Sequence, residues 1–159
     1  MSPLTPDILL VEDSRTAAEL FVLALEANKS DLVLHVVRDG AEALALLLGG
    51  VHVSGLAEAP LPRLLLLDLH MPGLNGFEVL ERLRAHERTR LLPVVVFSAS
   101  DAEAHKDRAM RCGATAYLDK PIGFRAACDV IADLERKWLS SEPPAPKPHD
   151  ESDGDPPCA

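Results

Sequence analysis

The stretch LLLLDLHMPGLNG, residues 64–76, decides the fold because it joins a buried strand to a polar turn. Its four consecutive leucines have neither helical spacing nor alternation, and such a run is typical of a strand buried on both faces. The run stops at Asp68, and turn-forming Pro-Gly and Asn-Gly pairs follow it. A carboxylate at the end of a buried strand is unfavourable unless a partner or ligand stabilises it. Asp68 is therefore the first candidate functional residue.

A short apolar run followed by an amphipathic segment repeats along the chain. The central strand, residues 63–67, is joined by further apolar runs that predict strands at residues 8–11, 32–37, 94–97 and 115–118. Apolar residues at helical spacing predict helices at residues 14–28, 41–48, 76–87, 101–111 and 124–138. Residues 51–62 contain Gly and Pro and predict a loop. This alternation predicts an α/β fold, a doubly wound five-stranded parallel sheet with helices on both faces.

The chain length of 159 residues favours one domain. We expect a short leader at residues 1–6, a folded domain at residues 7–139 and a tail at residues 140–159. Six of the last nineteen residues are proline and five are acidic, and the segment has too little apolar surface to offset its ordering entropy. The tail is therefore predicted to be disordered, and we expect no DNA-binding or enzymatic output domain.

Composition excludes several classes of protein. The formal net charge of −9 argues against a nucleic-acid-binding surface, which needs a basic face. No apolar run reaches the roughly 18 residues of a membrane span, and the N-terminus has no signal-peptide pattern. The three cysteines lack metal-ligand spacing. We expect a cytoplasmic protein without membrane contact.

Polar side chains follow the predicted strands at the points where they end. Glu12 and Asp13 follow the first strand, Ser98 follows the fourth, and Lys120 lies just beyond the fifth. Ligands of open parallel sheets bind beyond the carboxyl ends of the strands, so we expect these groups to meet Asp68 at one edge. Glu12 and Asp13 are also well placed to cap the first helix, which is a simpler role. Because Asp68 and Lys120 are expected at the same edge of the sheet, we favour a role in a functional site.

Three carboxylates gathered at one edge repel one another. Two unit charges ~4 Å apart cost about 4 kcal/mol at an effective dielectric of ~20. A divalent cation relieves this repulsion, and an all-oxygen, partly hydrated site suits Mg²⁺. With the cation present, Lys120 can bind a phosphoryl oxygen and Ser98 can donate a hydrogen bond to another. The pattern predicts a phosphoryl-transfer site whose nucleophile is Asp68 and whose other catalytic groups are Lys120 and Ser98.

At these residues the chain resembles the receiver domain of two-component response regulators, over about residues 7–139. The resemblance rests on the motifs LVEDS (residues 10–14), LDLHMP (67–72), NGFE (75–78), FSA (97–99) and DKP (119–121). It implies the flavodoxin-like receiver fold with strand order 2-1-3-4-5. Many members of the family have Asp where this chain has Glu12, and Thr where it has Ser98. Neither departure threatens the chemistry.

The resemblance also implies a role for each site residue. Asp68 would accept a phosphoryl group from a phosphohistidine on a sensor histidine kinase, and Lys120 would bind that group, presented by a cis peptide bond at Pro121. Ser98 and Tyr117 would be the switch residues of a surface made by the fourth helix, fifth strand and fifth helix. Mg²⁺ would be held by a set of four groups: the side chains of Glu12, Asp13 and Asp68 and the backbone carbonyl of His70.

A closer resemblance is to the single-domain regulators associated with bacterial phytochromes. It rests on VRDGAEAL (residues 37–44), on the loop before the central strand and on NGFE (75–78). It implies a red-light sensor histidine kinase as partner and a homodimeric regulator. Trp138, on the last helix, is the best candidate for an interface residue, although core packing would explain it equally well.

Two further readings of the site remain open. A Mg²⁺-dependent phosphohydrolase of the haloacid-dehalogenase type would also use an aspartyl phosphate, but it carries a second acid where this chain has His70. A receiver can also act as a phosphate sink in a phosphorelay. As a receiver of either kind, the chain is expected to have no enzymatic activity beyond its own phosphorylation and dephosphorylation. The His70 side chain is expected at the rim of the pocket, where it would tune the access of water to the phosphoryl group. A flavodoxin-like mononucleotide binder is disfavoured because the first loop is acidic.

Overall fold

The computed structural model of the chain describes residues 6–48, 61–99 and 103–139. Five strands form one parallel sheet in the order β2-β1-β3-β4-β5, which confirms the predicted fold and strand order. The strands are β1 (Ile8–Val11), β2 (Leu34–Val37), β3 (Leu64–Asp68), β4 (Val94–Ser98) and β5 (Ala116–Asp119). The helices are α1 (Arg15–Ala27), α2 (Gly40–Leu48), α3 (Gly76–Ala85), α4 (Glu103–Arg111) and α5 (Phe124–Trp138).

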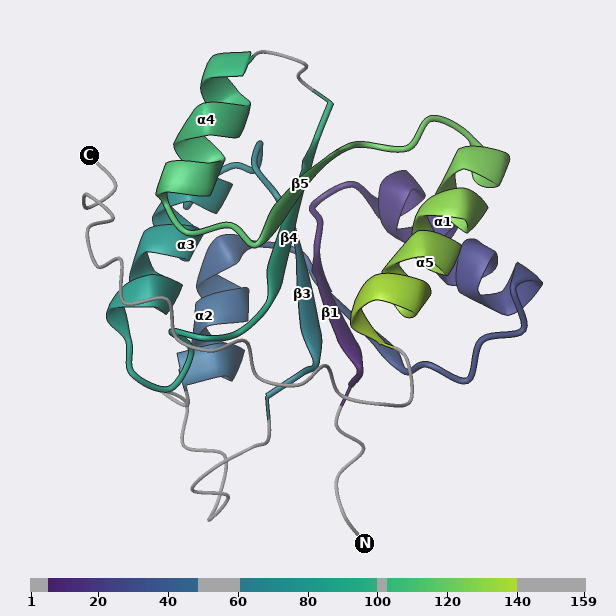
Figure 1. Ribbon diagram of the computed structural model, residues 1–159, viewed down its shortest axis with the longest axis horizontal. Coiled ribbons are helices and arrows are strands. Elements are labelled where there is room, and N and C mark those ends of the chain that lie inside the picture. Colours follow the sequence, from purple (N-terminus) through teal and green to yellow (C-terminus); the bar gives the residue numbers. More distant parts are fainter. Residues whose placement is uncertain (1–5, 49–60, 100–102, 140–159) are drawn as a thin grey trace, which may run out of the picture.

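The sheet is the middle of three layers (Figure 1), with α1 and α5 on one face and α2, α3 and α4 on the other. Successive leucines of β3 point to opposite faces. Leu64 and Leu66 belong to the core under α1 and α5, and Leu65 and Leu67 belong to the core under the other three helices. All four are at most 1% exposed, so the leucine run is buried on both sides as its pattern predicts.

The turn after β3 is fixed by local contacts. Asn75 and Glu78 form a capping box at the N-terminus of α3, in which each side chain accepts a hydrogen bond from the other residue's main-chain N–H. A Cβ on Gly76 would lie 2.7 Å from the Leu69 Cα, so glycine is required for the close approach of α3 to the strand end. These contacts hold the main chain immediately after Asp68.

Element boundaries differ slightly from the prediction. β2 begins at Leu34 rather than at residue 32, and α3 ends at Ala85 because His86 has extended dihedral angles. β3 and β5 each run one residue further, to Asp68 and Asp119, because both residues still pair with β4. Asp68 and Asp119 are therefore the last residues of their strands, at the carboxyl-end edge of the sheet.

Some predictions lie wholly or mostly outside the described residues. These are the leader, the loop at residues 51–62, the start of the fourth helix and the tail at residues 140–159. Among the helices that the structure describes, none combines the length and the apolar character that a membrane crossing requires.

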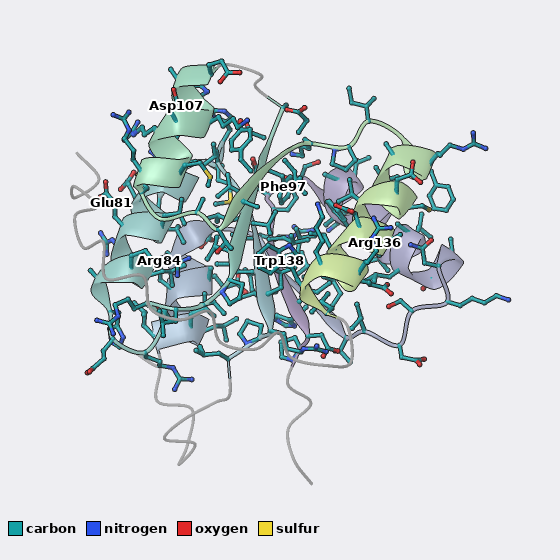
Figure 2. The ribbon with its side chains drawn as sticks, in the orientation of Figure 1. Glu81, Arg84, Phe97, Asp107, Arg136 and Trp138 are labelled. Carbon is teal, nitrogen blue, oxygen red and sulfur yellow. The ribbon has the colours of Figure 1, made fainter. Side chains whose placement is uncertain are left out.

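The predicted interface residue Trp138 is half-buried and packs against the core under α1 and α5. Figure 2 labels it near the C-terminal end of α5, and Phe97 on β4. Phe97 lies in the same core and meets Phe21 of α1 edge to face at 5.5 Å. The described contacts of Trp138 are thus those of a core residue.

Candidate phosphoryl-transfer site

The carboxyl ends of β1 and β3 bring the acidic residues together. Val11 is the register partner of Leu67, so Glu12 and Asp13 follow β1 at the level where β3 ends in Asp68. Glu12, Asp13 and Asp68 each offer a carboxylate oxygen, and these oxygens lie within 4.8 Å of one another. Glu12 is 1% exposed and Asp68 is 3% exposed, whereas Asp13 faces solvent.

Lys120 reaches this cluster from the end of β5. Its Nζ lies 2.8 Å from Glu12 Oε2 and 3.4 Å from Asp68 Oδ2. Its main-chain N–H donates to the carbonyl oxygen of Ser98 at 2.9 Å, which ties the residue to the end of β4. A single ammonium group therefore faces two buried carboxylates.

Two main-chain donors orient the buried carboxylates. The Ser14 N–H donates to Glu12 Oε1 at 3.0 Å, and the His70 N–H donates to Asp68 Oδ1 at 3.1 Å. The helix cap is a separate group, since the Ser14 hydroxyl accepts from the Ala17 N–H. Glu12 is thus committed to the acidic cluster, and Ser14 serves as the N-cap of α1.

Burial raises the pKa of Glu12 from 4.5 to about 7. The Lys120 ammonium group and the Ser14 N–H favour the ionised form and lower the pKa, but burial outweighs them. The negative charge of Asp68 adds to the upward shift. For Lys120, burial opposes the charge, but the contacts with Glu12 and Asp68 outweigh burial and raise the pKa above its usual 10.5. Lys120 therefore stays charged at neutral pH.

The donor set fits a hard divalent cation. Three carboxylates gather here, and the one ammonium group contacts two of them. Glu12 Oε2 is buried without a hydrogen bond of good geometry even though the Lys120 Nζ is close. Oxygen ligands at this spacing are those that Mg²⁺, Mn²⁺ and Ca²⁺ take. A bound cation would also favour the ionised form of Glu12, which burial alone disfavours.

The remaining site residues lie on the neighbouring strands. Ser98 is 1% exposed at the end of β4. Tyr117 is half-buried on the adjacent β5 and packs against the core under α2, α3 and α4. The register pairs Val96 with Tyr117 and Ser98 with Asp119, so the two predicted switch residues are two positions apart on adjacent strands.

The peptide bond between Lys120 and Pro121 is trans, so the cis bond implied by the family resemblance is wrong for this structure. A trans bond to proline is favoured by about 0.5–1 kcal/mol unless the surroundings select the other isomer. Here Lys120 reaches Glu12 and Asp68 with the trans bond in place. Nothing in the position of the ammonium group requires the cis form.

Sequence reasoning missed His105. The exposed His70 ring meets the ring of His105, on α4, at a centroid distance of 5.2 Å and an interplanar angle of 62°. The apolar stripe of this helix is weak, and the one available signal was that His105, Ala109 and Cys112 share a helical face. That spacing places His105 towards the sheet but does not reveal its contact with residue 70.

The family model of the response regulator receiver domain matches residues 8–132. The probable methanogenesis regulatory protein FilR2 of Methanothrix harundinacea is 36% identical over 132 residues, which are 83% of each chain. Response regulator Rcp1 of Synechocystis is 31% identical over 134 residues, 84% of this chain and 89% of that protein.

Solved structures agree with these matches. The Mn²⁺-bound form of Rcp1 has a TM-score of 0.73 at 32% identity, covering 88% of this chain and 99% of that one. The phosphorylated cyanobacterial phytochrome response regulator RcpA has a TM-score of 0.76 at 30% identity, covering 89% and 99%. The fold, the acidic edge of the sheet and these relatives agree, and the chain belongs to the response regulator receiver domain family of two-component signalling proteins.

Proposed function

We propose that the chain is a phosphoacceptor and that Asp68 takes its phosphoryl group from a phosphohistidine on a sensor histidine kinase. The observation that carries this proposal is the setting of Asp68. Its carboxylate is 3% exposed at the end of β3, with two further carboxylates within 4.8 Å and the Lys120 Nζ at 3.4 Å. Such a site offers one nucleophile, and the neighbouring charged groups can position a phosphoryl group and neutralise its charge.

In the proposed reaction a carboxylate oxygen of Asp68 attacks phosphorus. An O–P bond forms and the P–N bond of the phosphohistidine breaks, with its electron pair remaining on the imidazole. The imidazole leaves as a neutral ring when its other nitrogen already carries a proton. Lys120 would neutralise part of the charge on the transferred group, and the Ser98 hydroxyl would donate to a phosphoryl oxygen.

Mg²⁺ would be held by Glu12, Asp13, Asp68 and the main-chain carbonyl oxygen of His70, directly or through water. When bound, the ion supplies the positive charge that lets an anionic phosphoryl group approach three carboxylates. The all-oxygen donor set and the buried Glu12 Oε2 that lacks a hydrogen bond support this assignment. The Mn²⁺-bound form of the relative Rcp1 supports a divalent cation in this fold.

Phosphorylation would act on the surface formed by α4, β5 and α5, with Ser98 and Tyr117 as the switch residues. The support is their placement on the adjacent strands β4 and β5. Ser98 follows Phe97, which is the register partner of Asp68, and Tyr117 packs on the face of the sheet that α4 covers. A phosphoryl group that binds the Ser98 hydroxyl would bias this surface between two arrangements. The signal would then leave through protein contacts.

The proposed partner is a phytochrome-type sensor histidine kinase, and the proposed assembly is a homodimer in the cytoplasm. The support is the likeness to the phytochrome response regulator RcpA and to Rcp1. We propose no enzymatic activity beyond the protein's own phosphorylation and dephosphorylation. Sedimentation with and without beryllofluoride tests the dimer, and an unchanged monomeric value in both conditions would contradict it.

Acetyl phosphate labelling followed by mass spectrometry tests the phosphoacceptor. The wild-type protein with Mg²⁺ is expected to gain one phosphoryl group, and Asp68→Asn is expected to gain none. Asp119→Asn is the matched control, because this acid ends β5 at the same edge but faces solvent. Persistent labelling of Asp68→Asn would place the acceptor elsewhere. Steady turnover of a small phosphate ester well above background would instead favour a phosphohydrolase.

A further inference from the structure

Among the described residues, two groups of polar and ring contacts hold helix α4 to α3 and to the loop after β3. Its C-terminal end is closed by a Schellman motif, in which the Ala114 N–H donates to Ala109 O and the Gly113 N–H donates to Met110 O. Gly113 has the positive φ of 106° that this motif needs. Within α4 itself, Ala109 is the one buried residue.

The guanidinium of Arg84 on α3 fastens this C-terminal end. Its Nε donates to Gly113 O at 2.8 Å, and its Nη1 donates to the main-chain oxygens of Thr89 and Arg90 at 3.1 and 3.0 Å. Figure 2 labels Arg84 on α3, in the layer that also contains α4. The anchor therefore joins α3, the loop before β4 and the end of α4.

The second attachment is made by side chains on one face of α4. His105 meets the Phe77 ring at 6.1 Å, and one turn later the Arg108 guanidinium carbon lies 4.1 Å from the centre of the same ring. His105 also meets the His70 ring at 5.2 Å, edge to face. This second group of contacts reaches the loop that follows Asp68.

His70 connects this attachment directly to Asp68. Its main-chain N–H donates to Asp68 Oδ1, while Oδ2 of the same carboxylate faces the Lys120 Nζ at 3.4 Å. The His70 N–H and the Lys120 ammonium group thus each contact one oxygen of the carboxylate and orient it. His70 therefore contacts Asp68 through its main chain and contacts His105 of α4 through its ring.

We propose that His105 is a positioning residue for phosphoryl transfer, acting through His70 on the orientation of the Asp68 carboxylate. The inference rests on the proposed function, because it assigns Asp68 the nucleophilic role. Transfer to a carboxylate needs near in-line approach of the phosphoryl group, and small displacements of an attacking atom reduce rates steeply.

The test compares the rate of phosphorylation by acetyl phosphate in four proteins: wild type, His105→Ala, His105→Phe and Lys106→Ala. His105→Ala is expected to lower the rate at saturating donor about three- to tenfold, with the half-saturating donor concentration unchanged. His105→Phe retains a ring against His70 and is expected to recover most of the rate. Lys106→Ala is the control, because this neighbour on α4 is exposed.

A second comparison separates positioning from a general loss of structure. If His105 acts through His70, then His70→Ala lowers the saturating rate too, and adding His105→Ala to His70→Ala lowers it no further. In the unphosphorylated protein, the NMR amide signal of His70 should shift in His105→Ala and not in Lys106→Ala.

An unchanged saturating rate in His105→Ala, with the wild type labelled at Asp68, overturns the inference and leaves the proposed function intact. Equal losses in His105→Phe and His105→Ala overturn it too, because the ring contact would then be irrelevant. Absence of label in the wild type contradicts the proposed function itself, and the positioning role falls with it.

Discussion

Helices α4 and α5 flank β5 on opposite faces of the sheet (Figure 1), and they are held to the fold in different ways. α5 buries Ala127, Ile131 and Leu134 in the core that it shares with α1. α4 buries Ala109 alone, and its described contacts include ring contacts, the Arg84 anchor and the buried Cys112 that follows the helix. Segments with few buried apolar contacts open and shift at low free-energy cost. One face of the sheet is thus a firm platform, and the other carries a helix that can respond to events at Asp68.

The largest difference between the two helices is expected on truncating their apolar side chains. Ile131→Ala removes a side chain with 0% exposure and should lower the free energy of unfolding by about 2–5 kcal/mol. Met110→Ala, on α4, removes a side chain that is 44% exposed and should cost about 0.5 kcal/mol or less. Urea denaturation measures both variants. Similar losses in both would break the distinction between α4 and α5.

Removing the anchor of α4 should have the next largest effect. Arg84→Met leaves the carbonyl oxygens of Thr89, Arg90 and Gly113 without their guanidinium donor, at an expected cost of about 2 kcal/mol. Amide hydrogen exchange should accelerate in the last turn of α4 and stay unchanged in α5. Equal acceleration in both helices would mean that Arg84 supports the whole fold.

Stability should also depend on pH through Glu12, which follows β1 at the edge of the sheet where the acidic cluster lies. Its folded pKa of about 7 lies above its ordinary 4.5, so between these values the folded state holds more protons than the unfolded state. The free energy of unfolding should therefore fall as pH rises through this range, by at most about 1.4 kcal/mol per pH unit for one proton. Urea denaturation at pH 5, 6 and 7 in a metal chelator measures this slope. Glu12→Gln should remove it, and an unchanged slope in that variant would assign it to another group.

The smallest expected effect is a gain in stability on the firm face. Lys29 has φ 53° after α1, where its N–H donates to Glu26 O and the Ser30 N–H donates to Leu25 O in a second Schellman motif. Glycine tolerates this dihedral angle without strain, so Lys29→Gly should raise the free energy of unfolding by about 0.5–1 kcal/mol. The phosphorylation rate should not change. A changed rate would show that the α1 face also communicates with Asp68.

The sequence was sufficient for the sheet and for the acidic cluster because both follow from short-range patterns. Apolar runs such as Leu64 to Leu67 identify strands that are buried on both faces, and the alternation of strands with helices makes the sheet parallel. In a parallel sheet every strand delivers its following residues to one edge, so Glu12, Asp13, Asp68 and Lys120 had to meet.

The pattern could not supply features that depend on how elements pack. The contact of His70 with His105 joins residues 35 positions apart and depends on where α4 lies. The Arg84 anchor was invisible for a related reason, since its partners are main-chain oxygens and leave no trace in side-chain patterns. The cis bond at Pro121 came from family likeness and not from the residues, and it is the prediction that the structure contradicts.

Because Arg84 binds the main-chain carbonyl oxygen of Arg90, the side chain of Arg90 takes no part in the anchor. Arg90 contributes a main-chain oxygen to the anchor while its side chain faces solvent, and the adjacent Leu91 is 76% exposed. Residues 90 and 91 can accordingly be replaced by a protein engineer to carry a recognition epitope. The attachment of α4 would survive such replacement as long as Arg84 and Gly113 are kept.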